Sequence, residues 1–335
     1  MPRRWLVAVV VVCLAAGGVL AGRELASGSP PTAPPLPAGT ASFVRHAVDP
    51  VATAPPVGRV RFPTTRSGLT WRRRQITLSV GGLRRSALLL TPAAGVRRRL
   101  PVVVELAGAY VTAAEEAARA DYAAVTGPAV LVYPQDIGPG REDNWDAGAC
   151  CGMAAARHVD DVGFIAAVIR RVRSGVPYEG DAPVYLSGYS NGGKMALRMA
   201  CTDPGLFRAV AVYGAVESLI CHGNHPPPMS VLEMVGTDDP WTALDAATPP
   251  VTQRGFLEPT VAQEAGSYVR ADHCAHHVTE GRAGPVTELR WVDCGGARQV
   301  GVAVWNDQNH GWPERDGPEP SAQQVAWDFF RSLGA

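Results

Sequence analysis

The sequence has little lysine and no excess charge of either sign. Lysine occurs once, at Lys194, and 31 basic residues are balanced by 31 acidic ones, so the formal net charge is zero. A chain without net charge has no global field that would attract nucleic acid or a membrane surface, and we expect no nucleic-acid partner. The chain also lacks an internal repeat, which excludes solenoid and propeller architectures.

Acidic residues are missing from one long stretch. Between Pro50 and Val104 there are eleven arginines and neither aspartate nor glutamate. This pattern predicts solvated arginines on turns and edge strands. The alternative is a basic lobe that rests on an anionic envelope or polymer.

The N-terminus combines a short basic stretch with an apolar run. Residues 1–5 contain two arginines, and the run LVAVVVVCLAAGGVLAG follows, with small residues up to Ala21 that offer a cleavage site. Uncleaved, the run is nearly long enough to span a bilayer. We predict that residues 1–21 are a signal peptide or an N-terminal anchor, and that the protein is secreted or held at the cell envelope. Any membrane association is expected through this segment alone.

The cysteines agree with export. Removal of a leader that contains Cys13 leaves an even set of six: Cys150, Cys151, Cys201, Cys221, Cys274 and Cys294. An even set in an exported protein predicts three disulfides. Cys274 and Cys294 flank one hairpin-like segment and are expected to pair. The pairing of the other four stays open, although the neighbours Cys150 and Cys151 are expected to find separate partners.

Proline and hydrophobic periodicity divide the rest of the chain. Residues 22–57 are rich in proline and have no hydrophobic period, which predicts a disordered linker. One folded domain is expected over residues 58–335. Strands are expected at 76–80, 86–91, 100–108, 129–134, 182–188, 209–214, 229–236 and 300–305, and helices at 113–125, 160–173, 191–200 and 322–333. This alternation predicts an α/β fold with a mostly parallel sheet and helices on both faces.

One glycine-rich motif joins a predicted strand to a predicted helix. The stretch LSGYSNGGKMALRMA contains Gly188-x-Ser190-x-Gly192. A serine at such a turn forms a nucleophile elbow, which needs small residues two positions before and after it. In a chain with 36 glycines the bare pattern also arises by chance. The strand-to-helix context favours a nucleophilic Ser190.

A serine hydroxyl needs a histidine to take its proton, and the histidine needs a carboxylate to orient it. In this context the chain order is serine, acid, histidine. Asp239 follows the predicted strand 229–236 in GTDDPW and is the expected acid, with Asp238 as its competitor. His310 follows the last predicted strand and is the expected base.

An ester-cleaving site also needs two backbone N–H donors for the oxyanion. We expect one from Asn191, directly after the serine, and the other from Ala109 or Tyr110, after the strand 100–108. The histidines of DHCAHH, around Cys274, would allow a metal site. A disulfide with exposed histidines is the preferred interpretation, so we predict neither a metal nor a cofactor.

Five motifs together resemble the extracellular α/β-hydrolases of the polyhydroxybutyrate depolymerase and feruloyl esterase group: NWDAGACCG, HVDDVGFIAAVI, GYSNGGKMALRMAC, GTDDP and NHGWPE. The resemblance covers the chain from Pro101 onward and implies the α/β-hydrolase fold. It implies Ser190 as nucleophile, Asp239 as triad acid and His310 as general base, and it fits a Cys274–Cys294 disulfide. Asp160-Asp161 also matches the group, and we interpret this pair as a helix cap and a loop brace.

The resemblance also implies where the cleft lies. The predicted cleft residues are Tyr110, Trp145, Trp241 and Trp312, together with the Cys150-Cys151-Gly152 turn. Trp241 follows Pro240 where the group has a different sequence, so it adds a bulkier wall. Ala107-Gly108 stands where the group usually has His-Gly, but an oxyanion donor is a backbone amide and does not need that side chain.

We therefore predict a secreted or envelope-tethered serine esterase that works through an acyl-enzyme without a cofactor. Its partner is an ester substrate, polymeric ones included: a polyhydroxyalkanoate, or a feruloyl or acetyl ester of a polysaccharide. The alternative is a non-catalytic hydrolase-like protein that binds a cell-wall or extracellular polymer. The Pro-rich linker and the basic stretch fit this alternative, whereas the intact serine, aspartate and histidine argue against it.

Overall fold

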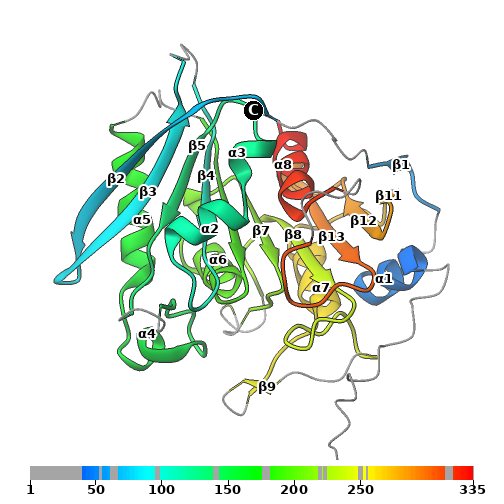
Figure 1. Cartoon of the computed structure of the whole chain (residues 1–335). Helices are drawn as coiled ribbons and strands as arrows, with labels where there is room; N and C mark the ends of the chain where they lie inside the picture. The colour runs from blue at the N-terminus through cyan, green and yellow to red at the C-terminus, as the bar shows by residue number, and fades with distance from the viewer. Residues whose placement is uncertain are drawn as a thin grey trace, which may run out of the picture. The chain divides into compact units, whose positions relative to one another are not determined.

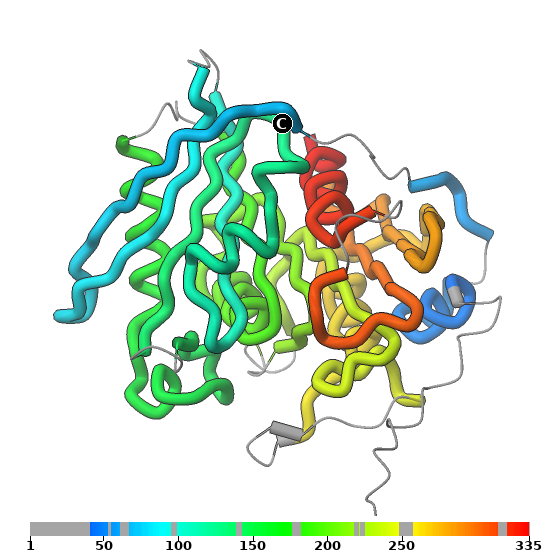
Figure 2. The backbone as a smooth tube through the Cα atoms, in the orientation of Figure 1, coloured from blue at the N-terminus to red at the C-terminus, as the bar shows by residue number. Residues whose placement is uncertain are grey.

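The described part of the chain forms a mostly parallel sheet of eleven strands (Figure 1 and Figure 2). Its order is β1-β11-β12-β13-β8-β7-β6-β4-β5-β3-β2. The strand bounds are β1 Gly58–Arg59, β2 Trp71–Val80, β3 Leu83–Pro92, β4 Val102–Leu106, β5 Val130–Pro134, β6 Val184–Tyr189, β7 Ala209–Tyr213, β8 Ser230–Gly236, β11 Val278–Ala283, β12 Val286–Trp291 and β13 Val300–Trp305. Strands β4 to β8 and β13 are parallel, and β2, β3 and β12 pair in antiparallel fashion at the two sides.

The computed structural model describes residues 40–52, 55–60, 67–94, 99–138, 143–175, 182–217, 221, 225–247, 252–253, 256–313 and 320–334. The predicted leader, residues 1–21, and the first part of the predicted linker lie outside these ranges. A separate small hairpin pairs β9 (Thr252–Gln253) with β10 (Phe256–Leu257).

Helices cover both faces of the sheet, as predicted (Figure 1). Their bounds are α1 Thr40–Val48, α2 Ala113–Arg119, α3 Tyr122–Val125, α4 Gly152–Ala156, α5 Asp161–Arg173, α6 Asn191–Thr202, α7 Val261–Ala271 and α8 Ala322–Ser332. Helices α1, α5, α6 and α7 share one apolar cluster, and α2, α3 and α8 share the other. Within the described ranges, no helix combines the length and the apolar character needed to span a bilayer.

The largely apolar sequence of β4 follows from these two layers. Val102 and Val104 pack into the cluster of α5, α6 and α7, and Val103 packs into the cluster of α2 and α8. Neighbouring side chains of a strand point to opposite faces, so a strand covered on both faces is apolar at most positions. The exception in β4 is Glu105, which is buried with its neighbours.

The structure refines two of the predicted helices, 113–125 and 160–173. The expected helix 113–125 is divided into α2 and α3, because Asp121 adopts a left-handed backbone conformation with φ 45°. The cap and brace expected of Asp160-Asp161 are confirmed. Asp160 Oδ1 accepts from the Gly163 amide at 2.8 Å, and Asp161 Oδ2 accepts from the Asp146 amide at 2.7 Å.

Residues 40–52 differ from the predicted linker, because they form α1 and the turn after it. The apolar residues at helical spacing are buried: Ala41, Val44 and Val48. The buried carboxylate of Asp49 accepts from the indole N–H of Trp291 at 3.1 Å and lies 2.7 Å from His276 Nδ1. An amphipathic stripe and a paired acid hold this segment against β12 despite the neighbouring prolines.

Part of the arginine-rich stretch lies on an edge strand, as predicted. β2 is the last strand of the sheet, and its residues 72–74, all arginine, are exposed. Arg85 on β3 is an exception, since it is buried and pairs with Asp161 at 2.8 Å. Its guanidinium carbon also lies 4.0 Å from the ring centroid of Phe164.

The disulfides confirm one prediction and correct another. Cys274 pairs with Cys294 across the β11–β12 hairpin, as predicted. Cys201 pairs with Cys221, and Cys150 pairs with its neighbour Cys151 instead of a separate partner. Cys150 Sγ lies 3.7 Å from the side chain of Asn191, the first residue of α6, and Cys201 lies near the end of that helix. Ten residues of helix separate Asn191 from Cys201 by about 15 Å. A Cys150–Cys201 pair is therefore out of reach.

Candidate active site

Ser190 stands at a sharp turn between β6 and α6. Its φ of 52° lies in a region that L-residues rarely occupy. Glycines make the turn possible, because a Cβ at Gly188 would overlap the backbone of Gly192, and a Cβ at Gly192 would overlap the carbonyl of Leu106. The Ser190 amide donates to the Tyr213 carbonyl at 2.9 Å. This is the geometry of a nucleophile elbow, which presents the hydroxyl at the carboxyl edge of the sheet.

His310 joins Ser190 to Asp239 through two hydrogen bonds. His310 Nε2 lies 2.8 Å from Ser190 Oγ, and His310 Nδ1 lies 2.8 Å from Asp239 Oδ2. With its proton on Nδ1, the imidazole donates to the carboxylate and accepts from the hydroxyl. Such a chain can take the serine proton during attack and stabilise the imidazolium that forms. The structure thus brings together the three residues selected from the sequence, although Ser190 and His310 are 120 positions apart.

Asp239, rather than its neighbour Asp238, meets the histidine. The Asp239 carboxylate is buried, and its second oxygen, Oδ1, accepts from the Trp241 amide at 2.8 Å. The Asp238 carboxylate accepts instead from the Thr237 hydroxyl at 3.1 Å. Both Asp239 oxygens therefore have donors, which fixes the side chain toward the imidazole.

Two tyrosines that the sequence analysis did not select hold the His310 loop. The Tyr189 hydroxyl donates to the His310 carbonyl at 2.7 Å, and the two rings lie 5.3 Å apart. The Tyr213 hydroxyl donates to the Asn309 carbonyl at 3.4 Å. Both tyrosines also pack against Trp312, with ring centroids 5.0 Å apart in each pair. The only sequence signal was the position of Tyr189, directly before the nucleophile.

A buried carboxyl group supports the same loop from α2. The indole N–H of Trp312 donates to Glu116 Oε1 at 3.2 Å. Burial raises the pKa of Glu116 to about 7. Burial, together with the charge of Glu116, also raises the pKa of Glu105 on β4 well above its ordinary value. The group that anchors Trp312 therefore gains and loses its proton near neutral pH.

The predicted oxyanion donors lie beside the serine. Asn191 directly follows Ser190, and a Cβ on Gly108 would lie 3.5 Å from the Ser190 Cβ, which places Ala109 next to the site. Within the described part of the chain, neither the Asn191 nor the Ala109 amide has an acceptor. The Tyr110 amide donates to a backbone carbonyl at 2.7 Å. Of the two alternatives from the sequence, Ala109 is the one available to a ligand.

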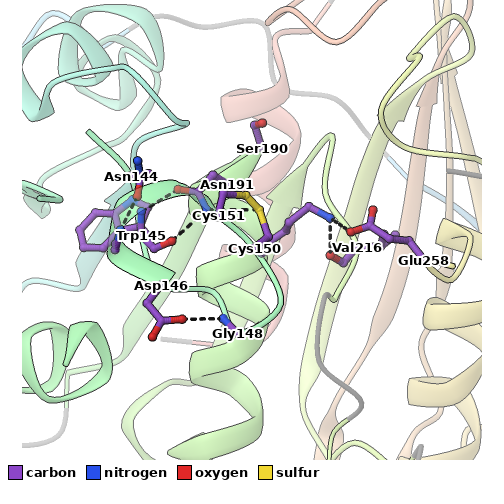
Figure 3. The surroundings of a disulfide bond; sticks show 12 residues. Asn144, Trp145, Asp146, Gly148, Cys150, Cys151, Ser190, Asn191, Val216 and Glu258 are labelled. Carbon is purple, nitrogen blue, oxygen red and sulfur yellow. Dashed lines mark hydrogen bonds and ion pairs between the residues drawn. A yellow bond between two sulfur atoms is a disulfide. The ribbon is translucent and has the colours of Figure 1, made fainter. Parts of the chain in front are cut away.

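Trp145 does not line the cleft, contrary to the prediction, because its side chain is 0% exposed. Its indole N–H donates to the Ala107 carbonyl at 3.0 Å, and its ring stacks on Phe164. The Asn191 side chain bonds both the Trp145 amide, at 2.7 Å, and the Trp145 carbonyl, at 3.2 Å (Figure 3). A large aromatic ring stabilises most when it is buried and its N–H has an acceptor. Trp145 therefore supports both segments that carry the predicted oxyanion donors.

The Cys150–Cys151 turn has a similar supporting place. Figure 3 shows this disulfide beside Asn191, whose side-chain nitrogen lies 3.7 Å from Cys150 Sγ. Cys150 is buried and Cys151 is partly buried, so the turn offers little surface to a substrate.

The other predicted cleft residues are accessible. The side chains of Tyr110 and Trp241 are 67% and 58% exposed, and Trp312 is partly buried. Tyr110 follows β4 and Trp241 follows β8, and these strands lie on opposite sides of β6 in the sheet. The loops that carry these two exposed rings therefore follow strands on the two sides of the Ser190 strand.

Known proteins provide a comparison for this site. No protein-family model matches the chain. The chain is similar to feruloyl esterase D of Neurospora crassa, with 26% identity over 178 residues, which are 52% of this chain and 57% of that protein. It is also similar to feruloyl esterase C of Emericella nidulans, with 29% identity over 162 residues, 46% of this chain and 54% of that protein. The chain spans about half the length of the curated relatives it matches.

Among solved structures, the chain resembles an acetyl xylan esterase from Aspergillus awamori. The TM-score is 0.50 at 13% identity, and the match covers 77% of this chain and 99% of that chain. At this identity the likeness concerns the fold. The serine turn follows β6, the acid loop follows β8 and the histidine loop follows β13. With this order along a mostly parallel sheet, the chain has the α/β-hydrolase fold, as predicted.

Proposed function

We propose that the protein is a serine carboxylic ester hydrolase. The observation that carries the proposal is the continuous hydrogen-bonded chain from the Ser190 hydroxyl through His310 to the Asp239 carboxylate. The similarity to two feruloyl esterases supports ester chemistry over other uses of the same side chains.

The first half of the reaction forms an acyl-enzyme. Ser190 Oγ attacks the ester carbonyl carbon while His310 Nε2 takes the hydroxyl proton, and Asp239 stabilises the imidazolium. The oxyanion accepts hydrogen bonds from the amides of Asn191 and Ala109. The tetrahedral intermediate then expels the alcohol, which leaves with the proton from His310.

The second half restores the enzyme. Water gives a proton to His310 and attacks the acyl carbonyl carbon, and a second tetrahedral intermediate forms in the same oxyanion site. Ser190 leaves with the proton from His310, and the carboxylic acid is released. Every proton transfer in this scheme uses the one histidine.

For the acyl group we favour a feruloyl or acetyl ester of a polysaccharide. The relatives with matching sequence are named feruloyl esterases, and the exposed rings of Tyr110 and Trp241 suit an aromatic or saccharide group. A polyhydroxyalkanoate, the other predicted substrate, would use the same chemistry. Three disulfides are typical of exported proteins. We therefore propose export as well.

A panel of esters tests the proposal: p-nitrophenyl acetate, methyl ferulate, acetylated xylan and polyhydroxybutyrate. We expect hydrolysis of at least one feruloyl or acetyl ester, and a loss of about 10⁴-fold or more in Ser190→Ala. Ser174→Ala, at an exposed serine after α5, is the matched control and should keep full activity. Folded wild-type protein that hydrolyses no ester of the panel, but binds one of the polymers, would favour the non-catalytic alternative.

A further inference from the structure

The chain's single lysine occupies a buried place beside the site. Lys194 lies in the first turn of α6, and its amide donates to the Ser190 carbonyl at 3.0 Å. The residue is only 5% exposed. Its ammonium group forms an ion pair with Glu258 at hydrogen-bond distance and donates to the Val216 carbonyl at 3.5 Å (Glu258 and Val216 are labelled in Figure 3). The reaction scheme gives this cation no chemical step.

Val216 belongs to the segment after β7, which packs against His310 and Asp239. Two residues before it, Gly214 has a φ of 59°, and a Cβ there would lie 3.0 Å from the His310 ring and 3.1 Å from Asp239 Oδ2. Only a glycine lets the backbone approach the imidazole–carboxylate pair this closely. The position of the segment after β7 therefore sets the space in which His310 and Asp239 meet.

Backbone hydrogen bonds hold both ends of this segment, residues 214–217. The Gly214 amide donates to the Met234 carbonyl at 2.8 Å, on β8. The Glu217 amide donates to Glu264 Oε2 at 2.8 Å, on α7. Lys194 supplies the charged anchor between these two points. Helix α6 also meets the segment at Gly193, which packs against Ala215, and at Cys201, whose Sγ lies 3.0 Å from Glu217 Oε1.

We propose that Lys194 is a positioning residue of the site: its buried ammonium group ties the nucleophile helix to the segment after β7 and so fixes the wall against which His310 and Asp239 pack. This inference rests on the proposed hydrolase function. Lys194 touches no reacting atom, so its effect passes through Gly214 and through the charge it places near Asp239.

The electrostatics agree with this role. Burial lowers the pKa of the Lys194 ammonium group, and the carboxylates of Glu258, Glu264 and Asp239 oppose that lowering. The lysine thus lies within the field of the triad acid as well as that of its direct partner. A buried ion pair can often be replaced by apolar side chains without loss of stability, so stability alone does not explain a charge in this place.

Enzyme kinetics provide the first test. In Lys194→Met we expect kcat to fall about tenfold or more with KM within about twofold, because a displaced wall misaligns the imidazole. We also expect the acidic limb of the kcat–pH profile to move to higher pH, since removal of the cation leaves more negative charge near the imidazole. Lys194→Arg, which keeps the charge, should recover part of the rate. Arg290→Met removes another buried cation, paired with Glu288, and should leave kcat unchanged.

A spectroscopic test does not depend on catalysis. Because Lys194 is the only lysine, protein labelled with [15Nζ]lysine gives one side-chain ammonium resonance. We expect this resonance to move in Asp239→Asn and to stay in place in Asp293→Asn, which changes an exposed aspartate paired with His277. Both variants keep the lysine, so the test holds even where Lys194→Met does not fold.

The outcomes separate the two proposals. Two results would overturn the role of Lys194. One is a folded Lys194→Met protein with the kcat and pH profile of the wild type. The other is an ammonium resonance that does not move in Asp239→Asn. If the wild-type protein hydrolyses no ester, only the proposed function is overturned. The ammonium resonance then tests whether Lys194 senses the charge of Asp239. A shifted resonance together with a reduced, Arg-rescued kcat supports both.

Discussion

The buried carboxyl group behind the histidine loop makes stability depend on pH. Glu116 is 0% exposed, and burial raises its pKa from the ordinary 4.5 to about 7. The folded chain therefore binds more protons than the unfolded chain between these two values. Its contribution to stability is fully present below pH 4.5 and is lost as the pH rises through 7. Glu116→Gln removes this titration and keeps an oxygen that can accept from Trp312.

The size of the effect follows from the shift. Each pKa unit corresponds to about 1.4 kcal/mol, so the rise from 4.5 to about 7 is worth about 3 kcal/mol. We expect Glu116→Gln and the wild type to have similar free energies of unfolding near pH 4.5. At pH 8 the variant should be more stable by about 3 kcal/mol, because it carries no buried charge next to Glu105.

Urea unfolding, followed by tryptophan fluorescence at several values between pH 4.5 and 8, measures this difference directly. Glu280→Gln, a substitution on β11 at a carboxylate paired with Arg282, is the control and should keep the wild-type pH dependence. The reasoning fails if Glu116→Gln is the less stable protein at pH 8, or if its stability falls with pH as steeply as that of the wild type.

Three further substitutions test separate parts of the site. Gly192→Ala would drive a Cβ into the Leu106 carbonyl, so we expect little soluble, active protein. Gly205→Ala is the control, because a Cβ there meets no atom within 4 Å and should be tolerated. Equal yields of active protein from the two variants would contradict the elbow geometry. Trp145→Phe loses the hydrogen bond to the Ala107 carbonyl, which holds the segment of the predicted oxyanion donor Ala109. We expect kcat to fall about tenfold with little change in KM, and an unchanged kcat would argue against this support. Trp241→Ala removes an exposed ring, and we expect the KM for methyl ferulate to rise. An unchanged KM would mean that Trp241 does not contact the substrate.

The sequence was sufficient where local chemistry decides the structure. The largely apolar sequence of β4, three valines and a leucine with Glu105 between them, indicated a strand covered on both faces, and Gly188 and Gly192 around the serine indicated a tight turn. The loops that carry Asp239 and His310 could be predicted because the carboxyl ends of parallel strands share one edge. The choice of Asp239 over Asp238 needed the fold, since the two neighbours differ only in the direction of their side chains.

The sequence was insufficient where distant segments decide. A tryptophan in a Gly-rich motif can line a cleft or fill a core, and Trp145 fills the core because Phe164 and the Ala107 carbonyl lie beside it. The helix α1 lies within a proline-rich stretch, and its apolar stripe has meaning only when β12 and α7 cover it. Lys194 stands out in the sequence as the only lysine, but its partners, Val216 and Glu258, belong to other parts of the chain.

A covalent trap at the serine tests the central claim most directly. The wild-type protein would be treated with a fluorophosphonate, digested and analysed by mass spectrometry. The account predicts one phosphonate on the peptide that contains Ser190, slower labelling in His310→Ala, and none in Ser190→Ala. Folded wild-type protein that takes up no phosphonate, or a Ser190→Ala variant labelled as fast as the wild type, would contradict it.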